Sequence, residues 1–161
     1  MTRAPILAAA LLTMTACSPS GSYDGSETPP VQVAGAVCRP TPTGRQMTGC
    51  YLTLTAPAAD RLVSAASPAA NIVQIHESRI ESGMMMMREL REGLPLPAGR
   101  AVALAPGGNH LMLLGVQEPL VAGDTVALTL TFATSGPVEV TATVGQPATA
   151  EGDHAAAPAA H

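Results

Sequence analysis

Residues 125–144 read TVALTLTFATSGPVEVTATV, two alternating apolar–polar runs separated by Ala-Thr-Ser-Gly. Alternation with a period of two is typical of a half-buried strand, and a short connection that contains Gly is typical of a hairpin. Short strands that recur without a long amphipathic helix predict an all-β fold, an antiparallel β-sandwich or barrel. The other short runs, punctuated by Gly, Pro, Asn and Asp, are 31–38, 50–56, 60–67, 71–78, 84–90, 100–104 and 110–116.

Composition limits the chain to one domain and excludes one class of partner. The 161 residues are enough for a single core, which must be built from Val, Leu, Ile, Ala and Met because the chain has Trp 0, Tyr 2 and Phe 1. The chain has 8 Lys and Arg residues against 12 Asp and Glu residues, with no basic stripe along the sequence. A nucleic-acid partner is therefore not expected. We expect a monomer.

The two ends of the chain differ in composition from the middle. Residues 1–17, MTRAPILAAALLTMTAC, have one positive charge and a short apolar run, which predicts a cleaved signal peptide rather than a membrane helix. The MTAC ending resembles a bacterial lipobox, so Cys17 is expected to be acylated. Residues 18–30 are rich in Ser, Gly and Pro and predict a flexible tether. Residues 145–161 are rich in Ala and Pro and predict a disordered tail, which leaves 31–144 as the folded domain.

The remaining cysteines, Cys38 and Cys50, flank a turn-rich connection between two expected strands. With Cys17 assigned to lipid, they are an even pair in an oxidising compartment, which favours a disulfide across neighbouring strands. A thiol metal site is the alternative.

Histidine and methionine gather in three short segments of the folded domain. Strand alternation places His76 on the face opposite Ile75, and it places His110 with Met112 on one face. Between these segments lie four consecutive methionines, Met84–Met87. Imidazole and thioether together favour Cu(I), because thioether sulfur is soft and neutral and has little affinity for Zn(II), Ca(II) or Mg(II).

Packing is the alternative explanation for these residues. Four consecutive methionines in a strand point two to each face, and methionine commonly fills cores. We therefore expect Met84 and Met86 to pack, on the face opposite Met85 and Met87. A single histidine is also more often a hydrogen-bonded core or surface residue than a metal ligand.

The order of these residues resembles the PCuAC-type periplasmic copper chaperones, whose pattern is His-x10-Met-x21-His-x-Met. Here ten residues separate His76 from Met87, and 22 separate Met87 from the His-x-Met that begins at His110. CYLTLTA, GMMMMR and LPAGRAVALAPGGNHLMLLG also follow that family's order, so the resemblance covers 31–144. The extra residue lies in the expected loop RELREG, which leaves Met85 as the alternative to Met87.

The resemblance implies a cupredoxin-like Greek-key β-sandwich that carries Cu(I) outside the cytoplasm. The implied ligands, at an exposed rim of the sandwich, are His76, Met87, His110 and Met112. The implied role is delivery of copper for the dinuclear centre of cytochrome c oxidase, to the copper-centre subunit or through a thiol-bearing assembly factor. The tail histidines His154 and His161 are either accessory copper ligands or ordinary solvated residues.

Two other functions remain open from the sequence. One is a metal-free, lipid-anchored interaction module. The other is a copper electron-transfer protein, which needs a thiolate beside two histidines, whereas the spare cysteines precede His76 and are expected to pair. No Ser/His/Asp order suggests an enzyme. The expected location is the periplasm, anchored to a membrane, and Ser18 after Cys17 is compatible with sorting to an outer membrane.

Overall fold

The computed structural model describes residues 30–147, which form ten strands with no helix in that range. Nine of these strands coincide with the runs predicted from the sequence. The three-residue strand around Pro95 was not predicted, because it is too short to show alternation. The strands are β1 (Gln32–Cys38), β2 (Met47–Thr55), β3 (Asp60–Ala66), β4 (Ala70–Glu81), β5 (Met84–Glu89), β6 (Leu94–Leu96), β7 (Ala101–Leu104), β8 (Asn109–Val116), β9 (Thr125–Phe132) and β10 (Gly136–Val144).

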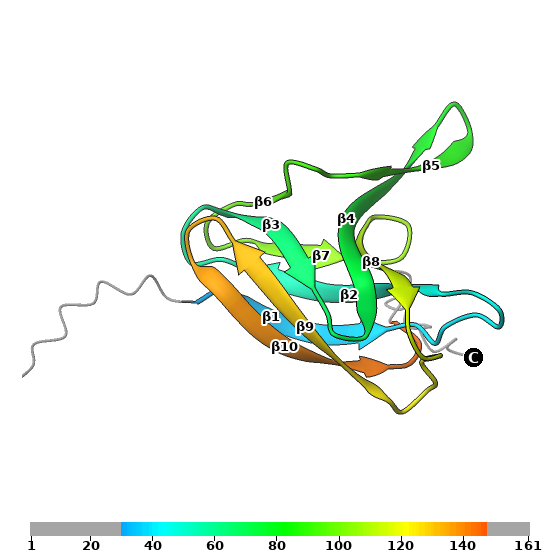
Figure 1. Ribbon diagram of the computed structural model, residues 1–161. Coiled ribbons are helices and arrows are strands. Elements are labelled where there is room, and N and C mark those ends of the chain that lie inside the picture. The colour runs from blue at the N-terminus through cyan, green and yellow to red at the C-terminus, as the bar shows by residue number, and fades with distance from the viewer. Residues whose placement is uncertain (1–29, 148–161) are drawn as a thin grey trace, which may run out of the picture.

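The strands close into a barrel (Figure 1). Their hydrogen-bonded order is β5-β4-β8-β2-β1-β10-β9-β3-β6, and a further pairing between β3 and β4 joins the two sides. Pairing within the described residues is antiparallel except between β1 and β10, which run parallel. The all-β fold is therefore as predicted, with one parallel pair that alternation alone does not reveal.

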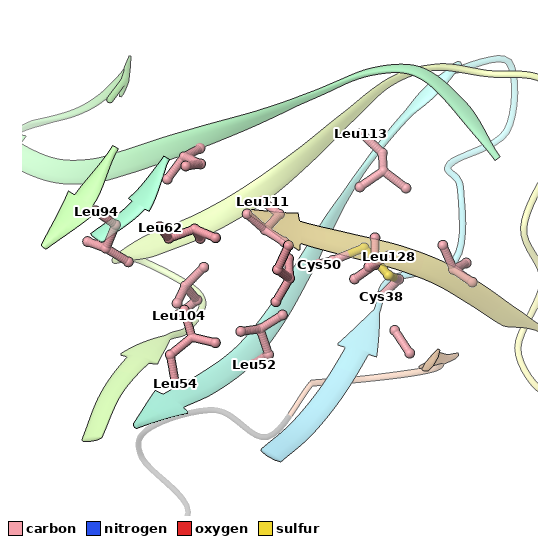
Figure 2. Packing of buried hydrophobic residues seen from close by; sticks show 14 of the residues in the cluster. Cys38, Cys50, Leu52, Leu54, Leu62, Leu94, Leu104, Leu111, Leu113 and Leu128 are labelled. Atoms are coloured by element: carbon pink, nitrogen blue, oxygen red, sulfur yellow. A yellow bond between two sulfur atoms is a disulfide. The ribbon is translucent and has the colours of Figure 1, made fainter. Parts of the chain in front are cut away.

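The interior is filled by alternate side chains of the strands. In β9 the apolar residues Val126, Leu128, Leu130 and Phe132 are buried, whereas Thr125 and the residues between them are more exposed. Figure 2 shows the same arrangement from other strands, with leucines of β2, β3 and β8 directed into one cluster. Burial of this apolar surface is the main stabilising contribution to the barrel.

A disulfide joins β1 to β2 inside this cluster, as predicted. Cys38 and Cys50 are directly opposite in the antiparallel register, with their Cα atoms 4.0 Å apart, and both are fully buried (Figure 2). The bond ties the start of the domain to the strand that runs beside β8.

The hairpin of β4 and β5 projects beyond the barrel (Figure 1). The first part of β4 pairs with β8, but from His76 onward β4 also pairs with β5, which has no other partner among the described strands. Ser82 and Gly83 form its turn, both with positive φ (51° and 79°), as a two-residue hairpin loop requires.

All four methionines of β5 are 47–64% exposed. The prediction that Met84 and Met86 pack in the core is therefore wrong. The reason is that β5 lies at the sheet edge in the projecting hairpin, where neither of its faces is covered by the barrel. Within 30–147, no helix is long and apolar enough to cross a membrane.

Candidate metal centre

A tight turn leads into the strand that carries His110 and Met112. Residues 105–108, Ala-Pro-Gly-Gly, form it: the Gly108 N–H donates to the Ala105 carbonyl (3.0 Å), and Gly107 has φ of 82°. Proline followed by a glycine with positive φ is the signature of a type II turn. The predicted double-glycine turn is therefore present, although only Gly107 requires the freedom of glycine.

His110 lies on the outer face of β8, yet it is only 4% exposed. Its Nδ1–H donates to the Gly108 carbonyl at 3.1 Å, which places the imidazole lone pair on Nε2. The backbone N–H of Ser78 donates to the same carbonyl, also at 3.1 Å. Neighbouring backbone thus fixes the tautomer and orientation of this ring. The expectation that the ligands are exposed is wrong for His110.

His76 lies directly opposite His110 on β4, with the two ring centroids 5.7 Å apart and edge to face. Its Nε2–H donates to the Gln74 amide oxygen at 3.0 Å, which leaves the lone pair on Nδ1. This Nδ1 is buried and has no hydrogen-bond partner. Burial, followed by the neighbouring His110, lowers the pKa of His76, and Glu89 opposes this shift.

The strand register places all four predicted ligands on one face of the sheet. Directly opposite partners share a face, and Met112 is opposite Gln74 while Met87 is opposite Ser78. His76 lies between these two positions on β4. Met112 on β8 and Met87 on β5 are therefore its diagonal neighbours, one on each side.

A cavity of about 380 Å³ opens on this face. Met87, His110 and Met112 line it, and so does Met85, the predicted alternative ligand. His76 is adjacent, next to His110, rather than part of the lining. The geometry brings three of the predicted ligands to one cavity and sets the fourth beside it.

Met47 also lines this cavity, and it is not among the predicted ligands. It lies at the start of β2 and is 42% exposed. It belongs to the segment between Cys38 and Cys50, for which the sequence predicts a turn-rich connection rather than a strand. Met47 precedes Gly49 by two residues and Tyr51 by four, so strand alternation places all three on one face. This spacing is the sequence signal for Met47.

An aromatic ring forms the wall of the cavity beside β2. Tyr51 is buried, 6.3 Å from the His110 ring by centroids, and its hydroxyl lies over Gly49, where a Cβ would come within 2.9 Å. The Arg39 guanidinium lies over the Tyr51 ring, 5.6 Å from its centroid. Gly49 therefore permits the close approach of this ring.

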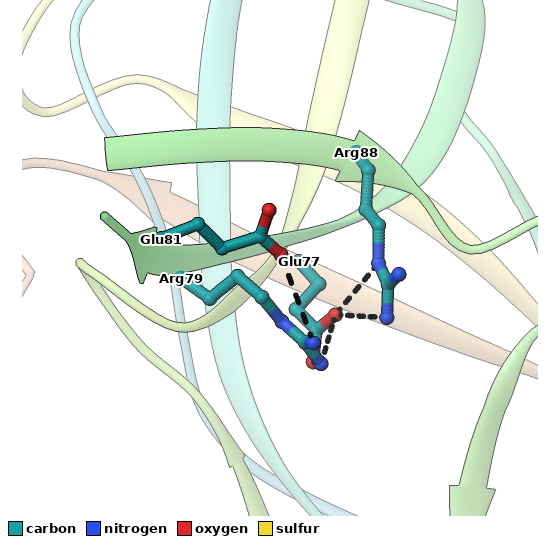
Figure 3. Close-up of polar contacts among 4 residues, drawn as sticks. All are labelled: Glu77, Arg79, Glu81 and Arg88. Atoms are coloured by element: carbon teal, nitrogen blue, oxygen red, sulfur yellow. Dashed lines mark hydrogen bonds and ion pairs between the residues drawn. The ribbon is translucent and has the colours of Figure 1, made fainter. Parts of the chain in front are cut away.

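The opposite face of the hairpin carries charges (Figure 3). Glu77 accepts from Arg79 (2.9 Å) and from the directly opposite Arg88 (2.9 Å). The hydrogen bond from Arg79, ahead of that from Arg88, lowers the pKa of Glu77. Met84 and Met86 share this charged face and therefore point away from the cavity. Met85 and Met87 are on the other face and point toward it.

Residues 30–147 contain no cluster of three or more His, Cys, Asp or Glu side chains that could hold a metal. Cys17, His154 and His161 lie outside the described residues.

A family model described as "Putative lipoprotein LpqE-like" matches residues 31–144. The chain belongs to the LpqE-like family. A relative from Leifsonia xyli subsp. xyli, "Putative lipoprotein Lxx21020", is 35% identical over 144 residues, which cover 86% of this chain and 87% of the relative.

Solved PCuAC domains have the same fold as this LpqE-like chain. The copper-bound PCuAC domain from PmoF2 matches with a TM-score of 0.59 at 24% identity, over 73% of this chain and 93% of that one. CuI-DR1885 from Deinococcus radiodurans matches with a TM-score of 0.57 at 32% identity, over 78% of this chain and 85% of that one. The apo form of DR1885 matches with a TM-score of 0.56 at 30% identity, over 88% of this chain and 96% of that one. The predicted cupredoxin-like fold and the resemblance to PCuAC domains are thus confirmed.

Proposed function

We propose that this LpqE-like protein is a lipid-anchored Cu(I) carrier of the extracytoplasmic space. The observation that supports it best is the set of neutral donors on one sheet face. Met87, His110 and Met112 line a single cavity, and His76, whose buried Nδ1 has no hydrogen-bond partner, lies next to His110. An unsatisfied buried acceptor is costly, by roughly 1–3 kcal/mol, and a bound metal ion removes that cost. The similarity to CuI-DR1885 supports the same ion.

The charges around the cavity favour a soft, singly charged ion. Among the described residues that line it there is no Asp or Glu, and Arg39 is the charged side chain. Hard divalent ions such as Ca(II) and Mg(II) commonly bind through carboxylate oxygen, which none of these lining side chains supplies. Thioether and imidazole donors suit Cu(I).

The ligand set is tested by alanine variants in competition with a Cu(I) chelator. Replacing His76, Met87, His110 or Met112 should weaken Cu(I) binding. Met84→Ala and Met86→Ala are matched controls, because they remove methionines from the same strand that face away from the cavity. If none of the first four variants differs from these controls, the copper site is elsewhere.

Met87 and Met85 are distinguished by the same titration. Met87 is opposite Ser78 and diagonal to His76, whereas Met85 is opposite Ile80, two residues further along the hairpin. Met87→Ala should therefore weaken binding more than Met85→Ala. The reverse order would mean that the longer spacer shifts the ligand to Met85. Removing residues 148–161 tests whether His154 and His161 add copper.

Lipid anchoring is proposed through Cys17. The family description and the Leifsonia relative both carry the term lipoprotein, which supports this assignment. Intact mass of the mature protein should show loss of residues 1–16 and added acyl chains, and Cys17→Ser should release soluble protein from the membrane. Membrane fractionation would test the proposed outer-membrane location. A soluble, unmodified wild type would exclude the anchor.

The proposed acceptor is the copper-centre subunit of cytochrome c oxidase, or a thiol-bearing factor that loads it. Thiolates bind Cu(I) more strongly than thioethers do, so transfer from methionine to cysteine ligands is downhill. Mixing the Cu(I)-loaded chain with each reduced acceptor and following copper by mass spectrometry would separate direct from indirect delivery. Retention of copper in both mixtures would rule out this role.

One observation favours a second candidate, an interaction module that needs no metal. The projecting hairpin exposes Ile80 and Met84 at 72% and 64%. Failure of the chain to bind Cu(I) would favour this function. A copper electron-transfer protein has less support, because Cys38 and Cys50 are both used in the disulfide and neither offers a thiolate.

A further inference from the structure

Each of the two proposed methionine ligands, Met87 and Met112, has a second, exposed methionine near it in the same cavity. On β5, Met85 and Met87 are two residues apart on the same face, roughly 7 Å along a strand. Across β8 and β2, Met112 is opposite Gly49 and Met47 is opposite Leu114, which makes Met47 a diagonal neighbour of Met112 at roughly 7–8 Å. Both outer methionines line the same cavity.

The surroundings keep the two outer thioethers accessible. Met47 and Met85 remain 42% and 56% exposed, so neither is used for packing. Gly49, between Met47 and Tyr51 on the same face of β2, has no side chain. The residue directly opposite Met112 therefore adds no side chain of its own, and the space above it is taken up by the Tyr51 hydroxyl.

We propose that Met47 and Met85 form an outer, weaker Cu(I)-binding step at the mouth of this cavity, through which the ion passes between the inner ligands and an acceptor. The inference rests on the proposed function. The step is ligand exchange: a bond from copper to an outer thioether forms while one to an inner donor breaks. Copper stays Cu(I), and no proton or electron moves, because thioethers are neutral in both states.

Methionine methyl NMR of the full chain, titrated anaerobically with Cu(I), tests this step. We expect the Met87 and Met112 methyl signals to change with the first equivalent. The Met47 and Met85 signals should change in fast exchange as further Cu(I) is added. Met84 and Met86 are internal controls in the same spectrum, because they are equally exposed but face away from the cavity.

The variants Met47→Leu and Met85→Leu should lose the additional Cu(I) binding, and they should weaken the first equivalent much less than Met87→Ala does. Leucine preserves apolar volume, so the fold is maintained, and Met84→Leu should behave as wild type. If Met47 and Met85 respond no more than Met84 and Met86, there is no outer step. If Met47 instead saturates with the first equivalent, it is an inner ligand and the two-step arrangement is wrong. Absence of any Cu(I) response at Met87 and Met112 would instead overturn the proposed function itself.

Discussion

His76 and His110 face each other across β4 and β8, and each offers a different ring nitrogen. Gln74 holds Nε2 of His76, so Nδ1 carries the lone pair, whereas the Gly108 carbonyl holds Nδ1 of His110 and leaves Nε2. The sheet therefore supplies both imidazoles in fixed tautomers. Such orienting partners of metal-binding histidines contribute to affinity without touching the metal.

Gln74→Ala should weaken Cu(I) binding by about 10-fold, because His76 loses the acceptor that fixes its tautomer. The measurement is a chelator competition on the single and double variants with His76→Ala. If Gln74 acts only through His76, the double variant should bind no more weakly than His76→Ala alone. Fully additive losses would show that Gln74 acts independently of His76, for example through Met112, which lies opposite it.

The metal-free protein should become less stable as the pH falls below about 6.5, the ordinary pKa of the His76 imidazole. Burial and His110 lower the folded-state pKa of His76, so the unfolded chain binds the proton at a higher pH than the folded chain does. The stability that the neutral His76 contributes is therefore fully present above the pKa of this residue in the unfolded chain. It is lost as the pH falls through the pKa of His76 in the folded chain.

Urea unfolding of the metal-free chain between pH 8 and about pH 5.5 measures this effect, because most carboxylates stay ionised over that range. His76→Gln should flatten the dependence. An unchanged slope in that variant would assign the titration to another group.

The disulfide should stabilise the barrel without taking part in copper binding. Cys38 and Cys50 are 12 residues apart in sequence, and opening a loop of this size should reduce the free energy of unfolding by about 3 kcal/mol. The Cys38→Ser, Cys50→Ser double variant should nevertheless bind one Cu(I), whereas Cys17→Ser, the matched control, should retain full stability. Two reactive thiols in the native protein, or loss of the bound Cu(I), would contradict this assignment.

The strands and the disulfide could be predicted because their signals are local. Alternation in 125–132 corresponds to the buried and exposed positions of β9, and the cysteines lie on strands that are adjacent in sequence. The exposure of Met84 and Met86 could not be predicted. It depends on β5 being an edge strand in a projecting hairpin, which is a property of the whole topology.

The candidate site was predictable in its residue types but not in its environment. His110 and Met112 were placed on one face by alternation, as the structure has them. The burial of His110 and the approach of Met47 depend on pairing between β2 and β8, whose paired residues are more than sixty positions apart in the chain. Contacts between strands so distant in sequence leave no periodic signal within either segment.

The turn before His110 offers a test of how the fold prepares the site. Gly107 has φ of 82° and Gly136 has φ of 74°, and no atom lies within 4 Å of a Cβ added at either position. Replacing either glycine with alanine should therefore destabilise the fold by a similar amount, roughly 1–2 kcal/mol, through backbone strain alone. Thermal unfolding of the two metal-free variants measures that shared loss.

Only Gly107→Ala should also weaken Cu(I) binding, because the next residue supplies the carbonyl that holds Nδ1 of His110. We expect a loss of about 10-fold, the size usual for disturbing an orienting partner of a metal ligand. Gly136 begins β10, where no predicted ligand lies, so its variant should keep wild-type affinity in the same chelator competition. Equal affinities for both variants would mean that His110 reaches its binding position without the turn, and that the Gly108 carbonyl does not orient it for copper.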